Sequence, residues 1–162
     1  MTAPRPQEKI MYAFVDRPVE SLCDGGRFLL WAMRGWTLTA ARGRCPPQAL
    51  HRGFAGLGAV SALPDFHVAL ALLASDARTP LVLKSMACPR VGEDEAVLLG
   101  LWRAVGGGDA AGARATLALV VADGAAGPIL AALTAAAAHL DVAGYDLSGL
   151  APLSSRLSGN TL

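Results

Sequence analysis

The three cysteines are the residues whose type and placement point most directly to chemistry. Cys23, Cys45 and Cys88 each lie directly before a dipeptide that is typical of a helix start: Asp-Gly, Pro-Pro and Pro-Arg respectively. The start of a helix lowers the pKa of a nearby thiol, because its partial positive charge and unpaired N–H groups stabilise a thiolate. Each thiol is therefore a candidate metal ligand or nucleophile.

A shared metal site is one use of these thiols. Three thiolates, with His51 or His67 as a fourth ligand, would suit zinc or an iron–sulfur cluster, and hence a redox sensor. The cysteines are 22 and 43 residues apart and form no C-x-x-C pair, so only the fold would bring them together. The alternative is that each is a small buried side chain, as free cysteines commonly are. No cofactor is therefore predicted from the spacing itself.

A surface of arginine and tryptophan is expected on the first helix, over residues 24–43. Its apolar residues recur with the 3.6-residue period of an amphipathic helix. The helical wheel places Arg27, Arg34 and Leu38 away from that apolar side, with Trp31 at the border. Guanidinium groups stack on indole rings, and both side chains are enriched at interface hot spots. These four residues are our predicted partner-binding surface; alternatively, Trp31 completes the core and the arginines are solvated.

The same region allows a DNA-binding interpretation, in which the first two helices form a helix-turn-helix. The second helix would then offer Gln48, His51 and Arg52 to bases and phosphates. A pI near 7.8 and an acidic second half argue against it.

Six helices and one extended connector must position these side chains. Periodicity, caps, prolines and glycines predict helices over residues 24–43, 47–57, 64–75, 93–106, 110–123 and 128–140. Residues 79–84 resemble a strand without a mate, so we interpret them as a connector. Short loops between helices favour an all-α, single-domain bundle. It is expected over residues 10–141, between flexible tails at 1–9 and 142–162.

Composition adds an apolar excess and a charge asymmetry. Hydrophobic residues make up 53% of the chain and charged residues 17%, against roughly 45–50% and 25% in ordinary globular proteins. Residues 1–90 carry 11 Lys and Arg against 6 Asp and Glu, whereas residues 91–162 carry 3 against 7. No acidic residue lies between Arg27 and Arg52. The excess and the asymmetry favour a surface that meets a partner, either another protein or a second copy.

No membrane segment or secretion signal is expected. The N-terminus lacks the pattern of a signal peptide, and the uncharged residues 124–140 are mostly alanine and include Pro128 and His139. With an odd number of cysteines, a reducing cytoplasm is the expected location.

Two stretches carry a resemblance. Residues 27–36 (RFLLWAMRGW) and 88–99 (CPRVGEDEAVLL) resemble small helical proteins of proteobacteria. The resemblance implies an all-helical domain and no particular activity, so no catalytic residue is carried over. The sequence therefore favours a non-enzymatic cytoplasmic protein that binds a protein partner or forms a homodimer. A metal-binding redox sensor and a DNA-binding regulator are the alternatives.

Overall fold

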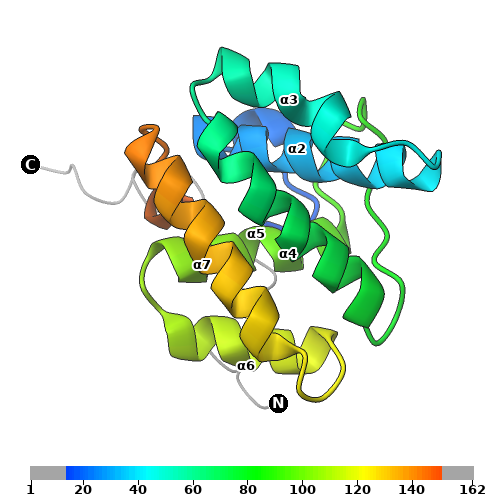
Figure 1. Cartoon of the computed structure of the whole chain (residues 1–162), viewed down its shortest axis with the longest axis vertical. Coiled ribbons are helices and arrows are strands. Elements are labelled where there is room, and N and C mark those ends of the chain that lie inside the picture. Colours follow the sequence, from blue (N-terminus) through cyan, green and yellow to red (C-terminus); the bar gives the residue numbers. More distant parts are fainter. Residues whose placement is uncertain (1–13, 151–162) are drawn as a thin grey trace, which may run out of the picture.

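A computed structural model describes residues 14–150 and confirms the predicted all-α bundle (Figure 1). This part of the chain contains six α-helices, three short 3-10 helices and no strand. The α-helices are α2 (Asp24–Ala41), α3 (Pro46–Gly56), α4 (Leu63–Asp76), α5 (Glu93–Gly106), α6 (Ala110–Val120) and α7 (Ala126–Val142). The 3-10 helices are η1 (Val19–Ser21), η2 (Val60–Ala62) and η3 (Leu147–Gly149).

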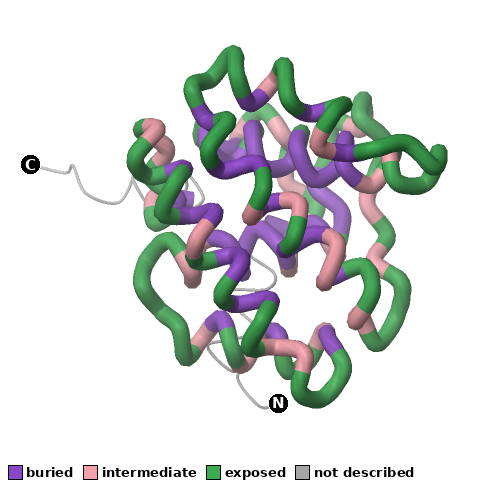
Figure 2. Tube along the Cα trace, viewed as in Figure 1, coloured by how far each residue is buried: buried purple, intermediate pink, exposed green. Residues whose placement is uncertain are grey.

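The helices pack in pairs around one core. In Figure 1, α2 and α3 lie side by side at one end of the molecule and α6 lies at the other. Between these ends α4 runs along α7, and α5 contacts α2, α6 and α7. The inward sides of these helices are buried (Figure 2), as their apolar spacing predicts.

A row of aromatic rings crosses the bundle. It begins at Trp102 of α5, whose ring stacks on Phe66 of α4 at a centroid distance of 5.8 Å. Phe66 lies 5.4 Å from Phe54 of α3, which meets Phe28 of α2 edge to face at 4.9 Å. Such contacts add to the free energy that burial alone provides. The row therefore links the deepest part of the core to the pair formed by α2 and α3.

The connector between α4 and α5 contains no helix and no strand, as expected for residues 79–84. Single β-bridges fasten its two ends, one from Ala77 to Val121 and one from Pro18 to Arg90. The second bridge holds the connector against the first described residues of the chain. The connector is thus an extended strap with fixed ends.

Residues 143–150 differ from the flexible tail expected from residue 142 onward. Leu147 and Leu150 are buried, and η3 packs against α5. A Cβ at Gly106 would overlap Leu147, so this glycine allows the close approach of η3. The tail was expected because residues 142–162 are rich in glycine and serine. This composition gives no sign that two leucines in the segment pack into the core. The remaining expected tail residues, 1–9 and 151–162, lie outside the described part.

No helix within residues 14–150 is long and apolar enough to cross a membrane. This includes α7, which spans most of the uncharged stretch noted in the sequence.

Candidate functional site

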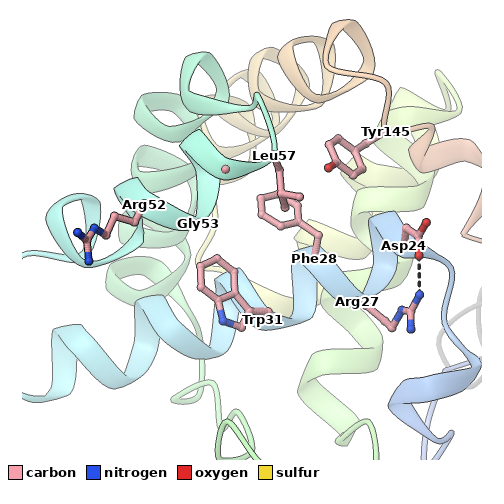
Figure 3. A pocket seen from close by; sticks show the side chains of 9 residues that line it. Asp24, Arg27, Phe28, Trp31, Arg52, Gly53, Leu57 and Tyr145 are labelled. Atoms are coloured by element: carbon pink, nitrogen blue, oxygen red, sulfur yellow. Dashed lines mark hydrogen bonds and ion pairs between the residues drawn. The ribbon is translucent and has the colours of Figure 1, made fainter.

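A groove of about 640 Å³ opens between α2, α3 and the segment that follows α7 (Figure 3). We call it the aromatic groove. Its lining residues are Asp24, Arg27, Phe28, Trp31, Arg52, Gly53, Gly56, Leu57 and Tyr145.

Three aromatic rings form the floor of the aromatic groove. The Phe28 ring is central, with its centroid 6.1 Å from that of Trp31 and 5.6 Å from that of Tyr145. Both pairs are stacked, and Figure 3 shows the three side chains facing the same opening. Because Phe28 also contacts Phe54, the groove is the open end of the aromatic row that crosses the core.

Gly53 sets the position of Trp31. A Cβ on Gly53 would overlap the six-membered ring of this indole, so only glycine lets the ring approach α3 this closely. The side chain is nevertheless not buried: Trp31 as a whole keeps 38% of its surface exposed. The structure thus holds a large aromatic side chain close to α3 while more than a third of its surface is exposed to solvent.

Two arginines flank the floor. Arg27 lies on α2 and forms an ion pair with Asp24, one turn earlier on the same helix. Arg52 lies on α3 at the other side of the rings (Figure 3) and makes no hydrogen bond or ion pair within residues 14–150. The Arg52 guanidinium is therefore available to a carboxylate from outside.

Arg34 does not belong to this surface, which corrects the sequence prediction. The residue is only 4% exposed, and its guanidinium forms a bidentate ion pair with Glu95 of α5. Nε lies 2.7 Å from Oε2 and Nη2 lies 2.9 Å from Oε1. Nη1 and Nη2 also donate to the backbone carbonyls of Cys88 and Arg90, each at 2.9 Å. The guanidinium thus fastens the connector and α5 to α2.

Glu95 completes this centre from the other side. Besides Arg34, its carboxylate accepts hydrogen bonds from the backbone N–H groups of Gly92 at 2.8 Å and Lys84 at 3.2 Å. The hydrogen bond from Arg34 to Glu95 raises the pKa of Arg34 above its ordinary value, although burial opposes the shift. The charges compensate each other, so this centre is structural. We call it the Arg34–Glu95 centre.

Leu38 lies on α2 but outside the aromatic groove. It is 40% exposed and lines a separate hollow with Arg42 and Met86, near the connector. Of the four residues predicted to form one surface, Arg27 and Trp31 are therefore brought together, whereas Leu38 lies apart and Arg34 lies inside.

Two of the three cysteines occupy the positions that the sequence predicts. Cys23 is the N-cap of α2 and Cys45 is the N-cap of α3, and both are exposed. Cys88 is not at a helix start, because α5 begins five residues later, at Glu93, after Gly92 as its N-cap. Its Sγ instead donates to the carbonyl of Arg90 at 3.4 Å. The acidic residues 93–95 form the first turn of α5, in agreement with the helix predicted over residues 93–106.

The candidate metal ligands are not brought together. His51 is exposed on α3, and His67 accepts a hydrogen bond at Nδ1 from Nε1 of Trp36 at 2.9 Å. No three His, Cys, Asp or Glu side chains in the described part of the chain are grouped so that they would hold a metal ion. The alternative of a shared metal site therefore gains no support from the described residues, in which Cys23, Cys45 and Cys88 lie at the starts of α2 and α3 and in the connector.

Sequence reasoning missed three residues that matter here. Tyr145 lies in the segment expected to be a flexible tail, and Leu57 and Glu95 lie in predicted helices but were not among the predicted site residues. Gly53 within a helix is the one signal that would have suggested a close approach to α3.

Comparison of the chain with models of protein families, with curated proteins and with solved structures found no match.

Proposed function

We propose that this protein is a non-enzymatic, cytoplasmic binding module and that the aromatic groove is its protein-binding face. The observation that carries the proposal is Trp31, whose ring packs closely against Gly53 and which is nevertheless 38% exposed. Tryptophan, tyrosine and arginine are the residue types enriched at the energetic centres of protein interfaces.

The groove is suited to binding because its floor is already in place. Phe28 is held between Phe54, Trp31 and Tyr145, so the rings need little ordering when a partner arrives. Side chains that are fixed beforehand lose less conformational entropy on association, which leaves more of the contact energy as affinity.

The lining residues also indicate the chemistry of the partner. Apolar rings at the floor fit an aliphatic or aromatic side chain, and Arg52 and Arg27 at the sides fit carboxylates next to it. The nine lining residues include no serine, cysteine or histidine, and the one carboxylate among them, that of Asp24, is paired with Arg27. These features support recognition of an acidic, apolar protein segment.

Selection from a library of displayed random peptides tests this function. We expect the protein to enrich peptides that combine an aliphatic or aromatic residue with Asp or Glu. Trp31→Ala should abolish the enrichment, because it removes the fixed ring. Leu38→Ala is the matched control, since Leu38 lies on the same helix with nearly the same exposed fraction but outside the groove.

Failure to enrich any such peptide would contradict the proposed function. Equal loss of binding in the Trp31→Ala and Leu38→Ala variants would also contradict it, because the groove would then not be the binding face. Circular dichroism of both variants should show that the helices are retained.

A further inference from the structure

The last turn of α7 presents an apolar side chain between two carboxylates. Val142 is 89% exposed, more than any other large apolar residue in the part that the structure describes. Asp141 precedes it, and Asp146 follows after the turn that ends α7; both are exposed. We call residues 141–146 the acidic knob. A single exposed apolar side chain is common at protein surfaces; the carboxylates before and after it in the sequence distinguish Val142 from the others.

The acidic knob offers carboxylates to a groove in which Asp24 already pairs with Arg27 and Arg52 has no partner among the described residues. No acidic residue occurs from residue 25 to residue 64, the stretch that contains α3 and nearly all of α2. No Lys or Arg occurs from residue 115 to residue 155, the stretch that contains α7 and the knob. Opposite charges on two surfaces of one protein favour contact between two copies. Val142 would meet the rings, and Asp141 would meet Arg52.

The knob and the groove also share an edge. Tyr145 belongs to the knob sequence, yet its ring stacks on Phe28 and lines the groove. Figure 1 shows the C-terminal end of α7 at the same end of the molecule as α2 and α3. Two surfaces that adjoin in this way satisfy the requirement of a two-fold dimer, in which each copy offers both halves of the contact.

We infer that the aromatic groove takes the acidic knob of a second copy of this chain, so that the protein forms a two-fold dimer. This inference rests on the proposed function of the groove, and it names the partner. Each dimer contains the contact twice, with Val142 of one copy against Trp31 of the other and Asp141 facing Arg52.

Sedimentation equilibrium of the purified full chain tests the inference through a charge exchange. The wild-type protein should be dimeric at low salt, and added salt should weaken the dimer. Arg52→Glu and Asp141→Arg should each weaken it about tenfold or more, because like charges then face each other. An equimolar mixture of the two variants should form a dimer again, since one of its two contacts regains a pair with the charges exchanged. Arg44→Glu is the control, because Arg44 is exposed in the same acid-free stretch but outside the groove.

Three results would overturn the inference: a monomeric wild-type protein at about 100 µM, equal weakening by Arg52→Glu and Arg44→Glu, or no association in the mixture. The peptide selection separates these failures from failure of the proposed function. A monomer that still enriches acidic, apolar peptides through Trp31 keeps the function and loses the dimer. A monomer that enriches none loses both.

Discussion

Two arginines on α2 illustrate how differently one helix face is used. Arg27 and Arg34 are seven residues apart, which is almost two full turns, so they point to nearly the same side of α2. Arg27 lies at the open aromatic groove with half of its side chain exposed, whereas Arg34 is buried in the Arg34–Glu95 centre. The helix period is the same for both. What differs is the connector and the start of α5, which cover Arg34 and leave Arg27 exposed.

The comparison shows that the two regions differ in how far their polar side chains are paired within the chain. The paired region has a structural role, and the unpaired region is suited to binding. The Arg34–Glu95 centre uses the guanidinium and the carboxylate fully within the chain. The aromatic groove, by contrast, keeps Arg52 unpaired among the described residues and more than a third of the Trp31 surface exposed. Substitutions at the first region should therefore change stability, and substitutions at the second should change binding.

Arg34→Leu should have the largest effect on stability. It leaves the Glu95 carboxylate buried without its counter-ion, which typically costs about 3–5 kcal/mol of the free energy of unfolding. Urea denaturation measures the loss. Arg27→Leu is the matched control, because it removes an exposed ion pair worth about 0–1 kcal/mol.

If Arg34→Leu lowered the free energy of unfolding by less than Arg27→Leu does, the structural role of Arg34 would be contradicted. The double variant Arg34→Leu/Glu95→Leu should be more stable than Arg34→Leu alone, since no unpaired charge remains inside.

Gly53→Ala should have the next largest effect and should act on the groove. The new methyl group overlaps the indole of Trp31, which must move outward, and such crowding costs about 1–3 kcal/mol. The tryptophan fluorescence should shift to longer wavelength because Trp31 becomes more solvated. Gly56→Ala serves as the control, since a Cβ at that position meets no atom; equal shifts in both variants would be inconsistent with the contact.

Trp36→Phe should lower the free energy of unfolding by less, about 1 kcal/mol. It removes the hydrogen bond from Nε1 to His67 but keeps most of the ring volume. Thermal unfolding measures the change. Since Trp36 is buried on α2 and lies outside the groove, peptide binding should be unaffected, and a loss of binding would count against the division of the helix into two regions.

The smallest expected effect is a loss of stability at acidic pH that depends on Asp146. Its carboxylate accepts hydrogen bonds from Ser148, which lower the pKa of Asp146 below the ordinary value of 3.8. A lowered pKa in the folded state stabilises it above pH 3.8, and that contribution disappears as the pH falls through the lowered value. The unfolding temperature should be measured as a function of pH, and that of the wild type should fall slightly more in acid than that of Asp146→Asn. The same pH dependence in both proteins would contradict the role of Asp146 as the N-cap of η3.

The helices were predictable because each depends on local signals. Asp109 caps α6 through Gly112, and Pro128 lies in the first turn of α7, as their sequence positions indicate. The burial of Arg34 was not predictable, because it depends on where a connector without periodicity crosses α2. Tyr145 was missed for a related reason: its place in the groove depends on Leu147 and Leu150, whose packing requires glycines in α5 and α2.

The most direct test of the groove uses the three tryptophan indole N–H groups as reporters in a 1H–15N spectrum. Trp31 lies in the groove, Trp36 lies against His67, and Trp102 lies in the core. Titration with a selected acidic, apolar peptide should shift the Trp31 resonance and leave those of Trp36 and Trp102 unchanged. Saturable peptide binding that leaves the Trp31 resonance in place would contradict the assignment of the aromatic groove as the binding face.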